Sequence, residues 1–231
     1  MLFITRRTVL AFPLFLLAAF GPSANAGSIV IGTNNFGNYI PFFGGYGGGV
    51  EYQQLYGAAA FSGPIAITSI GFASADTGTG TDNVTISLST TSATLASPSG
   101  TFSANRGADF TQVFSGPISL TAANNGSFDL IFSTSLFHYD PSQGNLLLDV
   151  IINTSTGSPG GIPFESGSNS QVSRVYQGSA GLTGNPGVGD GLVTQFGTGT
   201  PEPGSLWLAA SAAFAILGWR TALRLRSSLH G

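Results

Sequence analysis

Residues 82–89 read DNVTISLS, a stretch in which apolar and polar side chains alternate with a period of two. Such alternation points every second side chain to the same face of a β-strand, so that one face is buried and the other meets water. Residues 127–133 (SFDLIFS) follow the same alternation over most of their length. Both stretches therefore predict strands with one buried face.

Further apolar segments predict more strands around these two. Residues 146–152 are almost continuously apolar, which is typical of a central strand covered on both faces. Shorter strands are predicted at residues 29–31, 65–72, 172–176 and 192–196. No segment of residues 28–197 has a long apolar period of 3.6 with capping residues. The sequence thus predicts an all-β domain, a β-sandwich or jelly roll of about eight to ten strands.

One short sequence occurs twice in this region. FSGPIAIT begins at Phe61 and FSGPISLT begins at Phe114. The Ser-Gly-Pro cluster is typical of a turn between strands. Two similar corners of one domain and a duplicated half-domain are both compatible with this repeat.

Composition and charge exclude several classes of function. The chain has 231 residues and no Cys, which excludes disulfides, thiolate metal sites and a cysteine nucleophile. Residues 27–200 contain nine Asp and Glu but only two cations, Arg106 and Arg174, a balance of −7. A nucleic-acid-binding surface must neutralise phosphates with basic side chains, so we expect no nucleic-acid partner.

Residues 1–26 have the three parts of a secretory signal peptide. Arg6 and Arg7 precede an apolar run at residues 9–20, and Ala24 and Ala26 form a small-residue cleavage site. The mature chain is expected to begin at Gly27. Because the paired arginines also resemble a twin-arginine export signal, the general secretory and twin-arginine routes both remain open.

The C-terminal residues 198–231 predict a linker, a membrane helix and a positive stop. The tripeptide Pro201-Glu202-Pro203 is followed by an apolar run at residues 206–219. The stop consists of Arg220, Arg224 and Arg226. If the helix extends to residue 223, it spans about 27 Å, close to the thickness of a bilayer core. The positive-inside rule then leaves the arginines in the cytoplasm and residues 27–197, the predicted ectodomain, outside.

The order Pro-Glu-Pro, apolar segment and arginine-containing end resembles the PEP-CTERM sorting domain of Gram-negative bacteria. The resemblance implies sorting by the membrane enzyme exosortase, with the export machinery and the membrane as further partners. It also implies a protein tethered to the inner membrane in transit and then located at the cell surface or in an extracellular matrix of polysaccharide and biofilm. Two internal segments, residues 51–56 (EYQQLY) and 139–149 (YDPSQGNLLLD), look like parts of other PEP-CTERM ectodomains but imply no activity.

The predicted ectodomain has few residues suited to catalysis. His138 is its single histidine and no Gly-x-Ser-x-Gly motif occurs, so we assign no catalytic residue. Its carboxylates leave glycoside hydrolysis as a weak alternative. No cofactor is expected, but Asp76 and Asp82 in the Gly/Thr-rich residues 76–83 are a candidate Ca²⁺ site, the alternative being a solvated hairpin loop.

We therefore expect a non-enzymatic structural or adhesive protein of the cell surface or matrix, linked to exopolysaccharide. The second hypothesis is a carbohydrate-binding module. Its sugar-stacking side chains would be exposed tyrosines, for which the candidates are Tyr39, Tyr46, Tyr52 and Tyr56.

Overall fold

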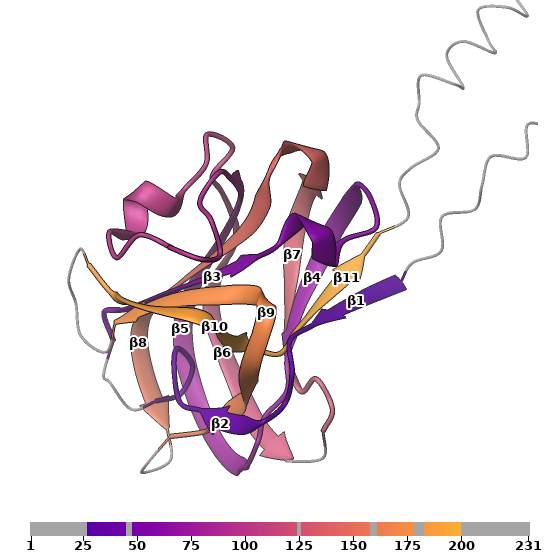
Figure 1. Cartoon of the computed structure of the whole chain (residues 1–231). Helices are drawn as coiled ribbons and strands as arrows, with labels where there is room; N and C mark the ends of the chain where they lie inside the picture. The colour runs from indigo at the N-terminus through magenta and orange to yellow at the C-terminus, as the bar shows by residue number, and fades with distance from the viewer. Residues whose placement is uncertain (1–26, 45–47, 124–125, 158–160, 178–182, 200–231) are drawn as a thin grey trace, which may run out of the picture. The chain divides into compact units, whose positions relative to one another are not determined.

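The domain is all-β, as predicted. The computed structural model describes residues 27–44, 48–123, 126–157, 161–177 and 183–199, which belong to the compact unit of residues 25–201. These residues form eleven strands and three short 3-10 helices (Figure 1). The predicted signal helix and C-terminal helix lie outside the described residues. Within the described ranges, no helix has the length and apolar character needed to cross a membrane.

The strands form two curled sheets, an arrangement consistent with a β-sandwich. The small sheet has the order β1 (Gly27–Ile31), β11 (Thr194–Thr198), β4 (Ile65–Phe72) and β7 (Leu130–Tyr139). The large sheet has the order β10 (Asn185–Leu192), β9 (Phe164–Gln177), β3 (Val50–Tyr56), β8 (Asn145–Gly157), β5 (Thr77–Thr91) and β6 (Thr111–Ala123). Strand β2 (Phe36–Asn38) also pairs with β9. The 3-10 helices are η1 (Ala58–Ala60), η2 (Phe102–Asn105) and η3 (Pro141–Gln143).

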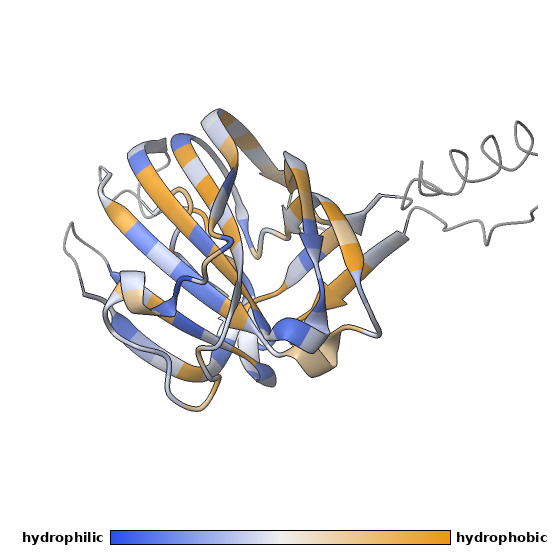
Figure 2. Cartoon of the chain, turned by 90° about the horizontal axis from the view of Figure 1, so that it is seen from above, coloured by the Kyte–Doolittle hydropathy of each residue, from blue (hydrophilic) through white to orange (hydrophobic). Residues whose placement is uncertain are grey.

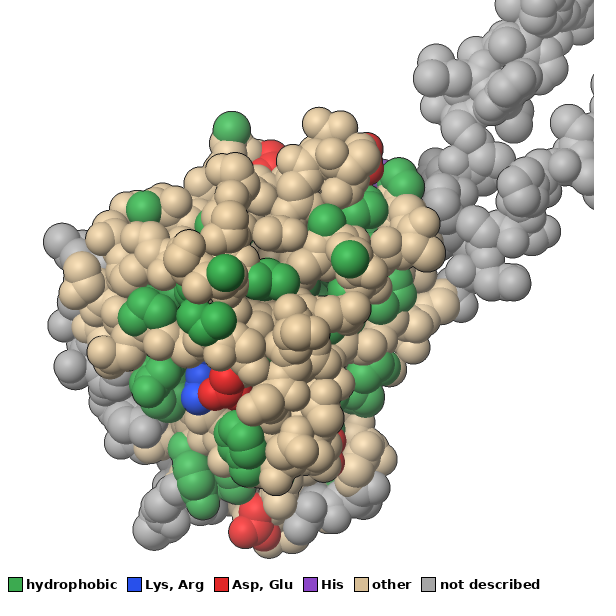
Figure 3. Space-filling view, in the orientation of Figure 1, with side chains coloured by type: hydrophobic (Ala, Val, Ile, Leu, Met, Phe, Trp, Pro, Cys, Tyr) green, Lys and Arg blue, Asp and Glu red, His purple; other side chains and the backbone are tan. Residues whose placement is uncertain are grey.

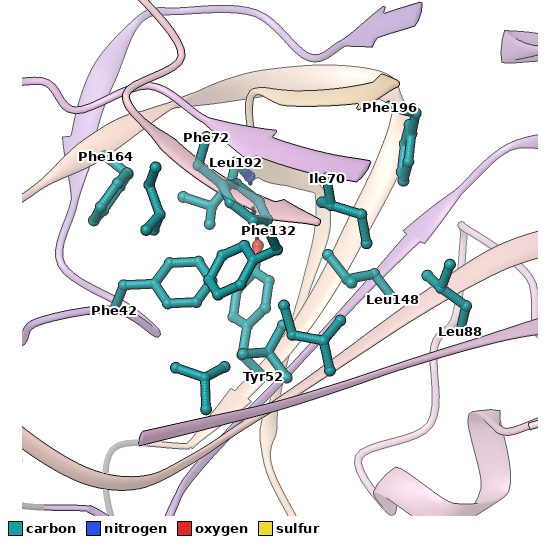
Figure 4. Packing of buried hydrophobic residues seen from close by; sticks show 14 of the residues in the cluster. Phe42, Tyr52, Ile70, Phe72, Leu88, Phe132, Leu148, Phe164, Leu192 and Phe196 are labelled. Atoms are coloured by element: carbon teal, nitrogen blue, oxygen red, sulfur yellow. Dashed lines mark hydrogen bonds between the residues drawn. The ribbon is translucent and has the colours of Figure 1, made fainter. Parts of the chain in front are cut away.

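The main core lies between the two sheets and is rich in aromatic rings. Along the strands, apolar and hydrophilic residues alternate as bands (Figure 2). Figure 4 shows the rings of Phe42, Phe72 and Phe132 gathered together, with centroids 4.9 Å apart for Phe42 and Phe72. Tyr56 of the large sheet meets Phe196 of the small sheet edge-on at 4.9 Å. Edge contacts of this kind add to the stabilisation that burial of the rings provides.

Both ends of the domain lie in the small sheet. The first strand, β1, pairs antiparallel with the last strand, β11, and Gly27 is opposite Thr198. The chain enters β11 directly from β10 of the large sheet, with Val193 between them. The single apolar segment predicted at residues 192–196 is therefore divided between two sheets.

One predicted strand boundary and one predicted turn are also corrected. The strand expected at residues 127–133 begins only at Leu130, because the Asp129 carboxylate accepts hydrogen bonds from the backbone N–H groups of Ser74 (2.9 Å) and Ala123 (3.3 Å). Asp129 thus fixes the turn that precedes β7 against the segments that follow β4 and end β6. The second Ser-Gly-Pro cluster is not a corner but lies inside β6, with Pro117 opposite Asn83. β6 pairs only with β5 among the described strands, and an edge strand tolerates a proline that cannot donate a hydrogen bond.

Candidate functional site

Charged side chains are concentrated in the large sheet. The four strands of the small sheet contain no Asp, Glu, Lys or Arg. The face seen in Figure 3 shows mostly backbone and uncharged polar side chains, with few charged ones. The charged strand residues all lie on the large sheet: Glu51, Asp82, Asp149, Glu165, Arg174 and Asp190.

The tyrosines proposed for sugar stacking do not form one surface. Tyr52 and Tyr56 are fully buried in the core, which corrects the expectation that they are exposed. They lie on the face of β3 that packs against the small sheet, so neither ring can meet a ligand. Tyr39 is 44% exposed and remains a candidate, whereas Tyr46 lies outside the described residues.

The buried tyrosines belong to a polar cluster in the core, which we call the inner cluster: Tyr52, Gln54, Tyr56 and Thr194. The Gln54 amide donates to the backbone carbonyl of Leu192 (2.9 Å) and accepts from the backbone N–H of Leu192 (2.8 Å). Tyr52 donates to the Gln54 carbonyl oxygen, and Tyr56 donates to Thr194 Oγ1 (2.7 Å). Leu192 is the last residue of β10, so Gln54 satisfies the backbone where the chain changes sheets.

The loop expected at the candidate Ca²⁺ residues is replaced by a strand in the structure. Residues 77–91 form the continuous strand β5, and only Asp76 of the two candidate ligands is exposed. Asp82 is buried, and its Oδ2 accepts a hydrogen bond from the backbone N–H of Phe43 (2.8 Å). Burial raises the pKa of Asp82, and Ser155 on the neighbouring strand lowers it again in part. Among the described residues, no group of three or more His, Cys, Asp or Glu side chains is placed to hold a metal ion.

A second polar cluster, the outer cluster, lies on the opposite face of β3 and β8: Glu51, Gln53, Asn105, Arg106 and Asp149. Residues 92–110, which we call the strap, connect β5 to β6 and carry two of these side chains. Gln53 donates to Asp149 Oδ2 (2.7 Å) and to the carbonyl of Phe102 (3.0 Å), and Asn105 donates to Gln53 Oε1 (2.9 Å). These hydrogen bonds fasten the strap to the large sheet.

Arg106 joins the two carboxylates of the outer cluster. Its Nε lies 2.9 Å from Asp149 Oδ2 and its Nη2 lies 2.9 Å from Glu51 Oε1. The Asp149 side chain is 1% exposed and that of Glu51 is 17% exposed. Burial and the Asp149 charge raise the pKa of Glu51 to about 7, although Arg106 acts in the other direction. Burial also raises the pKa of Asp149, against the lowering effect of Gln53 and Arg106.

The second arginine of the domain is likewise paired. Arg174 Nη2 lies 2.5 Å from Asp190 Oδ2, and the guanidinium stands over the Tyr176 ring at 4.9 Å. Both cations of residues 27–199 therefore serve internal contacts. His138 is exposed at a shallow depression that is also lined by Pro64, Ile65, Ala66, Tyr139 and Asp140.

An uncharged polar surface covers the outer side of β5, β6 and β8, and we call it the hydroxyl face. Its hydrogen bonds join Thr81 to Ser119 (2.9 Å) and Thr85 to Ser115 (3.4 Å) across β5 and β6. Asn153 of β8 donates to Thr85 Oγ1 (3.2 Å). These cross-strand contacts hold exposed hydroxyl and amide groups in fixed positions.

The sorting residues predicted from the sequence lie outside the described residues: Ala24, Ala26, Pro201, Glu202, Pro203, Arg220, Arg224 and Arg226. The outer cluster was missed by the sequence reasoning. Its signal was nevertheless present, since Asp149 interrupts the apolar run LLLDVII and Arg106 is one of only two cations in the domain. A charged residue inside a buried strand requires a partner.

Residues 51–56 and 139–149, the two internal segments singled out in the sequence, are neighbours in the fold. β3 pairs with β8, with Gln53 opposite Asp149 and Tyr56 opposite Leu146. A scan against protein-family models, a search of curated proteins and a search of solved structures found no match for this chain.

Proposed function

We propose that this chain is an exported protein of the PEP-CTERM type whose β-domain has a non-enzymatic structural or adhesive role at the cell surface or in an extracellular polysaccharide matrix. The resemblance of residues 201–226 to the sorting domain supports the destination. The exposed hydroxyl and amide groups of the hydroxyl face support a role that depends on the surface of the domain.

The observation that carries the proposal is the position of the fold between the two terminal segments. β1 begins at Gly27, one residue after the predicted cleavage site, and β11 ends at Thr198, three residues before Pro201. All the described strand pairings lie between these residues. Both segments can therefore be removed by processing without loss of any strand pair that the structure describes.

The mass and the first residue of the protein released from a Gram-negative host that carries exosortase test this proposal. We expect a chain that begins at Gly27 and has lost the residues beyond Pro203, because neither processing step would remove a residue of the described strands. A released chain that retains Trp219 and Arg220 would contradict sorting by exosortase.

A variant pair makes the test specific. Glu202→Ala changes the tripeptide and is expected to leave the chain in the membrane fraction. Thr198→Ala, at the end of β11, is the matched control and is expected to be released normally. Equal release of both variants would show that the tripeptide is not read.

The hydroxyl face favours carbohydrate binding as the second candidate function. The domain is acidic, so an anionic polymer would be repelled, whereas a neutral polysaccharide can hydrogen-bond to hydroxyl and amide groups. Because the side chains are already held by cross-strand contacts, binding would cost less conformational entropy. The hydrolase alternative has no comparable observation in its favour.

Retention on immobilised neutral polysaccharides tests this second function. Thr81→Val and Ser119→Ala together remove two hydroxyl groups of the hydroxyl face and should weaken retention. Tyr39→Ala tests the one exposed candidate for stacking. If the wild-type chain is not retained on any polymer, carbohydrate binding is wrong while the sorting proposal is unaffected.

A further inference from the structure

Polar contacts hold the strap on the outer face of the large sheet. Besides the outer cluster, the backbone N–H of Gly107 donates to Ser89 Oγ (3.1 Å), and Asp109 accepts from the backbone N–H of Thr90 (2.8 Å). Gly107 lies so close to β5 that an added Cβ would stand 1.8 Å from the Thr90 carbonyl oxygen. Hydrogen bonds and charges therefore help to hold the strap in place, together with the buried ring of Phe102.

The charges under the strap do not balance. Glu51 from β3 and Asp149 from β8 share one cation, Arg106 of the strap. The guanidinium also stands over the ring of Phe110 at 4.5 Å, which keeps it on this face. From β9, Arg174 cannot contribute, because it is opposite Gln54 on the other face and pairs with Asp190. Asp109, the remaining charged residue of the strap, is exposed and acidic.

An unused hydrogen-bond acceptor lies beside Glu51. Gln177 of β9 is directly opposite Glu51 in the β3–β9 register, so both side chains project from the same face. Gln177 is 9% exposed, and its Oε1 is buried with no hydrogen-bond partner. An ionised Glu51 has no proton to donate, whereas a protonated Glu51 has one. A buried acceptor without a donor is destabilising, so the site favours the protonated carboxyl.

We propose that Glu51 is a proton-operated latch for the strap. With a proton bound, the Glu51 O–H donates to Gln177 Oε1, and the charge of Arg106 is balanced by Asp149 alone. When the proton is lost, the strap loosens. Loosening uncovers apolar side chains of the large sheet. Leu55, Leu147 and Val175 are buried outside the main core cluster, and Phe102 of the strap lies beside Val175.

The direction of the pH effect follows from the pKa of Glu51, which is raised from 4.5 to about 7 with the strap in place. A group whose pKa is higher in the closed form binds protons more strongly there, so closure is favoured below the ordinary value and lost as pH rises to about 7. Between pH 5.5 and pH 8, opening of the strap should increase by at least about tenfold. Above pH 7 it should level off.

Hydrogen–deuterium exchange of the mature chain, measured at both pH values and corrected for intrinsic exchange rates, tests the latch. Peptides from residues 92–110 should show the tenfold increase, while peptides from β4 and β7 should not. Equal changes in the strap and in the small sheet would mean that the whole domain loosens, and the latch would be wrong.

Three variants separate proton binding from a general loss of structure. Glu51→Gln carries an N–H₂ group in place of the carboxyl O–H and should keep the strap protected at both pH values. Gln177→Leu removes the acceptor and should reduce the pH dependence. Asp109→Asn, the matched control on the strap, should leave the pH dependence unchanged.

Two outcomes would overturn the proposal. One is a strap in Glu51→Gln whose exchange still depends on pH as in the wild type. The other is full protection of the wild-type strap at pH 8 by millimolar Ca²⁺, which would identify the site as one for a divalent cation. Peptides from the small sheet show in each variant whether the domain has folded.

Discussion

The inner cluster makes a prediction about stability that depends on a single side chain. Gln54→Met keeps nearly the same volume and shape but removes both hydrogen bonds to the backbone of Leu192. Leu192 is fully buried, so water cannot replace the lost partners. Its backbone keeps two longer contacts, from its N–H to the Tyr52 hydroxyl (3.4 Å) and from Thr194 Oγ1 to its carbonyl (3.2 Å). Leaving a buried donor or acceptor unpaired costs about 1–3 kcal/mol for each group. We expect a loss of about 3 kcal/mol in the free energy of unfolding.

Urea unfolding of the mature domain, followed by circular dichroism, measures this loss. Both tryptophans, Trp207 and Trp219, lie beyond the described domain, so tryptophan fluorescence is not a suitable signal. For a domain of this size, a loss of 3 kcal/mol corresponds to a decrease in Tm of about 6–12 °C. Tyr52→Phe removes only one of the two donors to Gln54 Oε1 and should cost about 1 kcal/mol.

The matched control is Gln112→Met on β6, where the glutamine is exposed. A substitution of this kind at the surface should change stability by less than about 0.5 kcal/mol. If Gln54→Met costs no more than the control, the hydrogen bonds to Leu192 do not stabilise the change of sheet, and the role assigned to Gln54 is wrong.

Three further predictions concern the large sheet. Asp82→Asn keeps an acceptor for the Phe43 N–H but removes a buried carboxylate. Because burial raises the Asp82 pKa, the stability of the wild type should fall as pH rises through that pKa. Thermal melts of the variant should show a smaller fall over the same pH range. Gly107→Ala places a Cβ against the Thr90 carbonyl, so proteolysis within residues 92–110 should become faster; an unchanged cleavage rate would argue against the close approach. Finally, Tm should not change on addition of a calcium chelator, and a decrease would support the Ca²⁺ hypothesis for residues 76–83.

The sequence pattern predicted strands where one face is buried and the other is exposed. Residues 65–72 coincide with β4, and residues 82–89 lie inside β5 with Val84, Ile86 and Leu88 all buried in the core. In residues 82–86 the period of two follows local exposure, whereas Ser87 and Ser89 further along β5 are buried as well. For residues 82–86, no knowledge of the neighbouring strands was needed.

The pattern was less informative where both faces of a strand are covered. β3 packs against the core through Tyr52, Gln54 and Tyr56, and against the strap through Gln53. Its buried polar residues pair with Leu192 and Asp149, which are distant in the sequence, so their burial could not be read from residues 50–56 alone. The expectation that Tyr52 and Tyr56 are exposed was consequently wrong.

The start of β5 was missed for a different reason. Its Gly- and Thr-rich residues resemble a loop, yet Gly80 leaves room for the Phe43 ring, whose nearest carbon would lie 2.6 Å from an added Cβ. A side chain from another segment thus fills the core where this strand has none. The sequence of β5 alone does not indicate that Phe43 packs against it.

The pairing of the first and last strands has a mechanical consequence for a tethered protein. If the chain is held through its C-terminal segment while the domain adheres elsewhere, the pull enters at Thr198, the end of β11. β11 is flanked by β1 on one side and β4 on the other, so a force along the strand must shear two ladders of hydrogen bonds at once. An edge strand in that position could be peeled away one bond at a time. The domain should therefore resist unfolding by a force that is applied through its C-terminal end.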